Sequence, residues 1–183
     1  MKSRVLVIYG EKGAGKTSRA LEIAKKARKK GFKVLGILSK RILENDRTLG
    51  YDGLDLASNV RFPLARIKES VNSSDWQNFR NLIYSFNKKG FKRVNSILKK
   101  SAKLIDKNTL IIIDEYGRLE IEKEGLYPGF VNVIESLDNG GFVVILCRTD
   151  KIEPLLRFFP GEKVLLMRAD CQDFWESLGD SFI

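Results

Sequence analysis

The strongest pattern in the sequence lies near its amino terminus and reads Val5-Leu6-Val7-Ile8-Tyr9-Gly10-Glu11-Lys12-Gly13-Ala14-Gly15-Lys16-Thr17. Its first part, Val5–Tyr9, is a short, continuous run rich in β-branched residues, which is typical of a strand buried on both faces of a parallel sheet. Its second part, Gly10–Thr17, matches the pattern G-x-x-x-x-G-K-[ST] in full. The stretch therefore predicts a strand that leads into a glycine-rich loop.

A helix is expected directly after this loop. Small apolar residues recur at helical spacing, at Ala20, Ile23, Ala24 and Ala27, and form a narrow stripe suited to packing on a sheet. Gly31 supplies the end of the helix. The following strand completes a βαβ unit, which is right-handed by the general rule.

The loop has the composition needed to wrap around phosphate groups. Only a loop with little side-chain bulk lets several backbone N–H groups approach an anion so closely, and the next helix directs its positive end at the same anion. Lys16 would reach the β- and γ-phosphates, and the Thr17 hydroxyl would ligate Mg²⁺. We therefore expect a nucleoside triphosphate to contact the whole loop: Gly10, Glu11, Lys12, Gly13, Ala14, Gly15, Lys16 and Thr17.

Strands alternate with helices along the rest of the chain. Strands are expected at Val5–Tyr9, Val34–Leu38, Arg41–Leu43, Gly50–Leu56, Arg61–Ile67, Leu82–Phe86, Leu110–Ile113, Phe142–Cys147 and Lys163–Met167. Further helices are expected within residues 68–80, carrying Trp76 and Phe79, over residues 88–103, and over Val131–Leu137. The pattern predicts a three-layer α/β fold of the P-loop NTPase type, with a mostly parallel sheet and an antiparallel excursion at its edge. No repeat or linker divides the chain, so residues 1–183 are predicted to form a single domain.

A second chemical motif follows the apolar run Leu110–Ile113, which ends in Asp114-Glu115. A carboxylate at the carboxyl end of a strand beside the loop can hold Mg²⁺ directly or through water, and this is the role expected of Asp114. Glu115 would take a proton from an attacking water molecule. The alternative is that the two acids merely start a surface turn, but the upstream loop favours the functional interpretation.

Arg148 directly follows the strand Phe142–Cys147, at the same edge of the predicted sheet. Ligands of open α/β sheets bind at that edge, and a guanidinium there could neutralise charge on the γ-phosphate. Arg148 is therefore a candidate catalytic residue together with Lys16 and Glu115. An ordinary salt bridge to a neighbour such as Asp150 explains Arg148 equally well.

The composition is that of an ordinary soluble globular protein, with 43% hydrophobic and 31% charged residues. The formal net charge of +10 favours a polyanionic partner, of which a nucleotide is the smallest and nucleic acid the larger alternative. The run Lys25–Lys30 closes the first helix and is interpreted as a solvated helix end rather than a nucleic-acid patch. No targeting or membrane segment is recognisable, and two cysteines, Cys147 and Cys171, are expected as buried side chains in a reducing cytoplasm.

At Asp114-Glu115-Tyr116-Gly117-Arg118-Leu119-Glu120 the sequence resembles the D-E-[IY]-G-x-[LM]-E signature of the small thermophile and cancer-related nucleoside-triphosphatases. The loop Gly10–Thr17, the segment Gly50–Asp52 and the strand before Arg148 follow in that family's order. The chain departs from the family at Cys147, where members often have histidine, in a long insert around 68–80, and in its closing segment Asp170–Ile183.

The resemblance implies Mg²⁺-dependent hydrolysis of nucleoside triphosphates, ATP and GTP among them, to diphosphate and phosphate. It assigns phosphate binding to Gly10–Thr17, and metal and water to Asp114 and Glu115. It also implies an extra strand between the loop strand and the Asp-Glu strand, which the candidate strand at 82–86 could supply. Cys147-Arg148-Thr149-Asp150 is not the N-K-x-D element of a guanine-selective enzyme, so dedicated GTP specificity is not expected.

Two alternatives stay open on the sequence. A small-molecule or nucleotide kinase would use the same loop, but such enzymes usually add an arginine-rich lid, and none is visible unless the basic helix at 88–103 serves as one. A nucleotide-dependent nucleic-acid-binding protein would suit the positive charge, but no aromatic–basic RNA-binding pattern supports it. The sequence does not indicate an oligomeric state.

Overall fold

The computed structural model describes residues 4–79, 82–179 and 182, and within them nine strands form one sheet in the order β5-β6-β4-β3-β2-β7-β8-β1-β9. The strands are β1 Val5–Tyr9, β2 Lys33–Glu44, β3 Arg47–Asp55, β4 Arg61–Ile67, β5 Trp76–Asn78, β6 Tyr84–Asn87, β7 Thr109–Tyr116, β8 Phe142–Cys147 and β9 Val164–Arg168. The α-helices are α1 Lys16–Lys29, α2 Lys88–Lys103, α3 Arg118–Ile121, α4 Tyr127–Glu135, α5 Ile152–Leu156 and α6 Phe174–Leu178. Short 3-10 helices cover Lys68–Ser70, Ser136–Asn139 and Thr149–Lys151.

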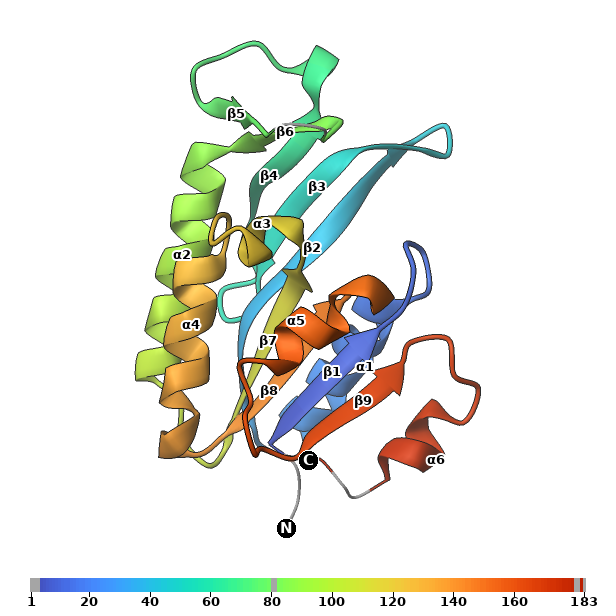
Figure 1. The fold of residues 1–183 in the computed structure, drawn as a ribbon, viewed down its shortest axis with the longest axis vertical. Coiled ribbons are helices and arrows are strands. Elements are labelled where there is room, and N and C mark those ends of the chain that lie inside the picture. The colour runs from blue at the N-terminus through green and yellow to red at the C-terminus, as the bar shows by residue number, and fades with distance from the viewer. Residues whose placement is uncertain (1–3, 80–81, 180–181, 183) are drawn as a thin grey trace.

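The sheet has a parallel half and an antiparallel half, which meet at β2. Strands β2, β7, β8, β1 and β9 pair in parallel, and the central strands β7, β8 and β1 carry buried apolar side chains on both faces. Strands β3, β4, β6 and β5 continue the sheet in antiparallel pairing and rise above the parallel half in Figure 1. The predicted α/β fold with an antiparallel excursion is therefore confirmed, and the excursion contains more strands than expected.

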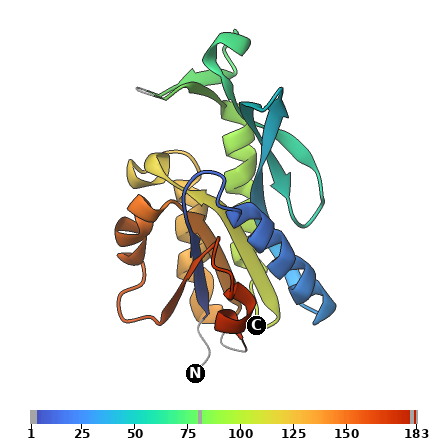
Figure 2. The same cartoon turned by 90° about the vertical axis from the view of Figure 1, so that its right-hand side faces the viewer.

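Helices cover both faces of the sheet and make the fold three-layered. One core cluster joins α1 and α6 to one face, through residues such as Ala20, Ala24 and Phe174. The other cluster joins α2, α4 and α5 to the opposite face, through Val94, Phe130 and Leu155. The two helical layers can be followed in Figure 2. This packing holds the carboxyl ends of the parallel strands β1, β7 and β8 together, at the same end of the sheet.

Three local predictions were wrong. Val34–Leu38 and Arg41–Leu43, expected as separate strands, belong to the single strand β2. Trp76 begins the short strand β5 rather than a helix, because its segment pairs with β6 through Trp76–Asn87 and Asn78–Ser85. The strand between β1 and β7 is β8, not the candidate at 82–86, which forms β6 at the far side of β4. A central parallel strand is buried on both faces, and the wholly apolar β8 suits this place, whereas β6 has alternating buried and partly buried residues.

The sequence shows no recognisable membrane segment, and the helices that the structure describes agree with this. Among the described residues, no helix combines the length and the apolar character needed to cross a membrane.

Cys147 is buried as expected, and its burial raises the pKa of the thiol to about 12. Cys171 is only partly buried, and its Sγ atom donates a hydrogen bond to Asp173, so the expectation of burial was wrong for this residue.

Candidate active site

The glycine-rich loop connects β1 to α1 at the carboxyl edge of the sheet. Gly13 and Gly15 both have φ of 90°, a conformation that residues with a Cβ rarely adopt, which explains glycine at these positions. The Lys16 Nζ atom donates hydrogen bonds to the carbonyl oxygens of Gly10 at 2.8 Å and Glu11 at 3.0 Å. The lysine amine is thus held across the loop, at the start of the helix whose positive end faces the same space.

Asp114 lies at the end of β7 and joins the loop to β2. Asp114 is 4% exposed, and its carboxylate accepts hydrogen bonds from the Thr17 hydroxyl and from the Ser39 backbone N–H, both at 3.0 Å. The Ser39 hydroxyl in turn donates to the Asp114 carbonyl oxygen at 2.8 Å. Burial, together with the neighbouring Glu115 carboxylate, raises the pKa of Asp114 to about 7.

Thr17 and Asp114 have the chemistry of a magnesium site. Both offer oxygen ligands, and their side-chain oxygens are already in contact. Mg²⁺ prefers such hard ligands and is usually bound by one or two protein groups together with substrate phosphates and water. The residues present therefore fit the metal that the sequence predicts.

Glu115 projects into the same pocket from an irregular position in β7. The pairing of β7 with β8 shifts between Asp114 and Tyr116, so that Glu115 has no partner in the register. Its side chain is open to solvent, yet protein atoms surround it within the pocket, and this desolvation raises its pKa. The cations Lys16, Arg148 and Lys12 act in the opposite sense.

Arg148 stands at the carboxyl end of β8 and lines the pocket, as predicted. Its guanidinium contacts Glu11 of the loop at 3.4 Å and Asp150 at 3.6 Å, and its side chain is 51% exposed. The salt bridge to Asp150 that was the alternative interpretation is therefore present. The same side chain also crosses to the loop, so a role at the γ-phosphate stays a prediction.

One pocket of about 600 Å³ brings most of these residues together. Lys12, Gly13, Gly15, Lys16 and Thr17 line it, with Asp114, Glu115 and Arg148. Gly10, Glu11 and Ala14 belong to the loop but not to the pocket lining.

Two residues of this region were missed by sequence reasoning. Ser39 fixes Asp114, and the only signal for it was its place after an apolar strand. Glu120 was noticed only as a letter of the signature, but it is buried and accepts hydrogen bonds from the backbone N–H groups of Gly117 at 2.8 Å and Leu126 at 3.1 Å. Glu120 therefore holds the segment that follows Glu115.

Comparison with known proteins gives matches over most of the chain. A family model described as NTPase matches residues 5–164, a range that contains the loop, Asp114, Glu115 and Arg148. The nucleoside-triphosphatase THEP1 of Methanocaldococcus jannaschii is 28% identical over 132 residues, which is 72% of this chain and 72% of that protein.

Two solved structures have a similar fold. The crystal structure of THEP1 from the hyperthermophile Aquifex aeolicus matches with a TM-score of 0.66 and 18% identity, covering 96% of this chain and 95% of that chain. The solution structure of a human cancer-related nucleoside triphosphatase matches with a TM-score of 0.67 and 19% identity, covering 97% and 94%. These two matches concern the fold.

Proposed function

Because this chain belongs to the NTPase family, we propose that it binds a nucleoside triphosphate in the pocket beside Lys16 and hydrolyses it, with Mg²⁺, to diphosphate and phosphate. The observation that carries the proposal is the contact between Thr17 and Asp114, with Glu115 next to them in the same pocket. P-loop NTPases need a loop that binds the phosphates, ligands for the metal, and a base for the attacking water.

Binding of the triphosphate would rest on the loop and Lys16. The backbone N–H groups of the loop and the positive end of α1 attract the phosphate oxygens. On binding of the triphosphate, the Lys16 amine would give up its hydrogen bonds to the carbonyl oxygens of Gly10 and Glu11 and would bind the β- and γ-phosphates instead. Mg²⁺ held by Thr17 and Asp114 would supply neutralisation of the negative charge on these phosphates.

Hydrolysis would require a water molecule beside Glu115. The water oxygen forms a bond to the γ-phosphorus, and the bond between that phosphorus and the oxygen of the β-phosphate breaks, so that the diphosphate leaves with the electron pair. The Glu115 carboxylate orients the water and takes its proton. Arg148, released from Glu11 or Asp150, would stabilise the charge on the transferred phosphoryl group.

Nucleotide preference is proposed to be broad. The segment after β8, Cys147-Arg148-Thr149-Asp150, carries no guanine-selective element. Recognition would therefore rest on the phosphates, and ATP, GTP, CTP and UTP are all proposed as substrates.

Replacing Glu115 with glutamine tests the assignment of the base. Glu115→Gln keeps the size of the side chain but cannot accept the proton, so phosphate release should fall by about 100-fold or more, while ATP affinity stays within a few-fold of the wild type. Release is measured with a phosphate-binding dye and affinity by calorimetry. The control is Glu135→Gln, an exposed residue at the end of α4, which should match the wild type. An unchanged rate for Glu115→Gln would sink the assignment.

A further inference from the structure

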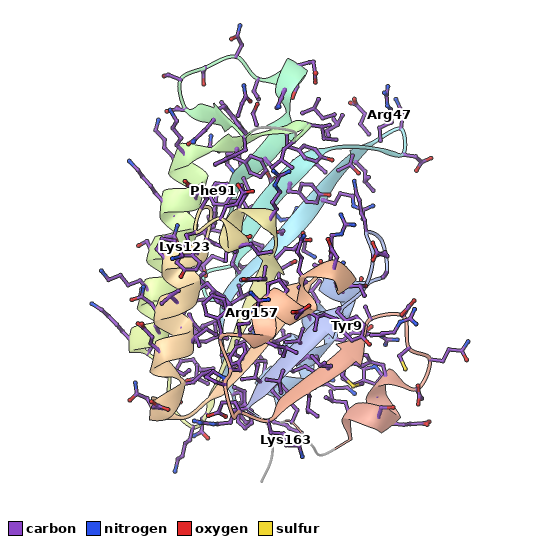
Figure 3. All side chains as sticks on the ribbon, in the orientation of Figure 1. Tyr9, Arg47, Phe91, Lys123, Arg157 and Lys163 are labelled. Carbon is purple, nitrogen blue, oxygen red and sulfur yellow. The ribbon has the colours of Figure 1, made fainter. Side chains whose placement is uncertain are left out.

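The pocket that holds the phosphate-binding groups is also lined by a group of aromatic side chains, and we call this part of the pocket the aromatic chamber. Four half-buried rings line the chamber: Tyr51 of β3, Tyr84 and Phe86 of β6, and Phe91 of α2. Apolar side chains complete its walls, namely Leu64, Ala65, Val94, Leu119 and Leu126. Phe91, labelled in Figure 3, lies where α2 meets the antiparallel strands.

In the order of the sheet, β7 with Glu115 lies between β1, which leads into the phosphate-binding loop, and the strands β3 and β6 of the aromatic chamber. The Glu115 carboxylate interacts electrostatically with Lys16, Arg148 and Lys12. It also interacts with Tyr51, where burial and the neighbouring Tyr84 and Glu115 raise the pKa of the phenol to about 12. The proposed base therefore lies close to groups of both parts of the pocket.

The direction of phosphoryl transfer places the chamber on the attacking side. In phosphoryl transfer the attacking and leaving oxygens lie roughly in line with the γ-phosphorus. Glu115, as the base, marks the attacking side, and the diphosphate with its nucleoside leaves on the opposite side. The chamber beyond Glu115 is thus open to an attacking group, and a water molecule alone does not require a space lined by four aromatic rings.

The walls of the chamber suit a flat ring. Tyr51 and Tyr84 pack edge to face with their centroids 5.6 Å apart, and Phe86 and Phe91 are also 5.6 Å apart. Aromatic side chains in such a group bind nucleobases by stacking, with little dependence on which base is bound.

The basic side chains of this pocket suit an anion. Lys40 and Arg41 of β2 and Arg118 of α3 line the same pocket. Arginine in particular recognises phosphate groups through its planar fork of donors. A ligand that combines a flat heterocycle with a phosphate group would satisfy both parts of the chamber.

We propose that the aromatic chamber binds a nucleoside monophosphate, which accepts the γ-phosphoryl group of the bound triphosphate. An oxygen of the monophosphate forms the new bond to the γ-phosphorus, the bond to the β-phosphate oxygen breaks, and two nucleoside diphosphates result. Any proton on the attacking oxygen passes to Glu115. The inference rests on the triphosphate-binding part of the proposed function, since both reactions use the same phosphate site, and hydrolysis is then the reaction of water when the chamber is empty.

The test uses the full chain with Mg²⁺, ATP labelled at the γ-phosphate, and AMP, CMP, GMP or UMP as the added acceptor. Thin-layer chromatography separates labelled phosphate from labelled diphosphate. At least one monophosphate should give labelled diphosphate, at the expense of labelled phosphate. Protein with Lys16→Ala, purified in the same way, controls for contaminating kinases and should give neither product.

Variants of Tyr84 test whether the phosphoryl transfer depends on the aromatic chamber. Tyr84→Ala should raise the KM for the monophosphate by about tenfold or more, since it removes a stacking ring, while Tyr84→Phe keeps the ring and should stay close to the wild type. Trp76→Ala is the matched control, because Trp76 lies on the neighbouring strand β5 and does not line this pocket.

The outcomes separate the two proposals. Labelled diphosphate that depends on Tyr84 supports the chamber, and turnover that occurs only with an acceptor supports the chamber while refuting hydrolysis. Label found only in phosphate, with all four monophosphates, would overturn the chamber and leave hydrolysis standing. No turnover under any of these conditions would refute both.

Discussion

Glu120 is buried, and the folded protein disfavours the ionised form of its carboxyl group. Burial raises its pKa to about 7, although the N–H groups of Gly117 and Leu126 donate to it and partly offset that effect. In the unfolded chain the pKa is near the ordinary glutamate value of 4.5. The folded state therefore binds this proton more tightly than the unfolded state does, and the free energy of unfolding must fall as pH rises between about pH 4.5 and 7.

A glutamine at this position should remove that dependence. A difference of one in pKa corresponds to about 1.4 kcal/mol, so the free energy of unfolding of the wild type should fall by about 2–3 kcal/mol more between pH 5 and 8 than that of Glu120→Gln. The variant should also be less stable at pH 5, because glutamine has one acceptor oxygen for the two N–H groups. Urea unfolding at several pH values measures both effects.

The comparison between variants isolates Glu120 from other titrating groups. Asp114 also has a raised pKa, but it is present in both proteins, so its contribution largely cancels. Glu124→Gln, at an exposed position of the same segment, should follow the wild type. Parallel pH curves for the wild type and Glu120→Gln would contradict the account of this residue.

Single residues were predicted where a motif fixes both type and spacing. Lys16, Thr17, Asp114 and Glu115 meet in one pocket because a loop and two strand ends bring them to the same edge. Ser39 escaped prediction because the group that binds the Asp114 carboxylate is its backbone N–H, which every residue except proline has. Its place opposite Asp114 depends on the pairing of β2 with β7, which no local pattern reveals.

At the scale of elements, the turn that follows α3 packs so closely at Gly125 that it leaves no room for a side chain there. This glycine has φ of 64°, and a Cβ atom here would lie 2.4 Å from Glu120 Oε1 and 3.0 Å from the Leu119 Cβ atom. The Glu120 oxygen has little freedom to move, because it accepts the Leu126 N–H group. The turn therefore excludes a side chain both by its backbone conformation and by its packing.

Gly125→Ala should lower the free energy of unfolding by more than backbone strain alone. Gly161 is the matched control, because it has φ of 78° and a Cβ atom added there would meet only open space. Gly161→Ala should cost about 1–2 kcal/mol, as is usual for an alanine in the left-handed region, and Gly125→Ala about 1 kcal/mol more. Urea unfolding of the two variants is the measurement, and equal losses would contradict the packing argument.

Elements were predicted well where apolar residues recur strongly and poorly where partners lie far away in the sequence. The apolar runs of β1, β7 and β8 and the spacing in α1 and α2 identified these elements from the sequence. The segment around Trp76 is polar, so pairing with β6 determined its conformation, as tertiary context often does. The position of β8 between β1 and β7 is likewise a property of the sheet as a whole.

At the scale of the molecule, the two halves of the sheet supply different parts of one pocket. The parallel half brings the loop, Asp114, Glu115 and Arg148 to its carboxyl edge, and the antiparallel half adds Tyr51, Tyr84 and Phe86 of the aromatic chamber. The strand β2 and the segment from Gly117 to Leu126 join the two parts, as the views in Figures 1 and 2 allow the reader to follow. A fold of this kind places the chemistry at the junction of its two halves.

The most direct measurement of the central claim is phosphate release from ATP, GTP, CTP and UTP by the purified chain, with Mg²⁺ and with excess EDTA. We predict release from all four triphosphates in the presence of Mg²⁺, and loss of that release with EDTA or in the Lys16→Ala variant, because on this proposal the loop binds the phosphates, and Thr17 and Asp114 bind the metal. Absence of phosphate release from every triphosphate, or release that persists unchanged with EDTA and in Lys16→Ala, would contradict the account.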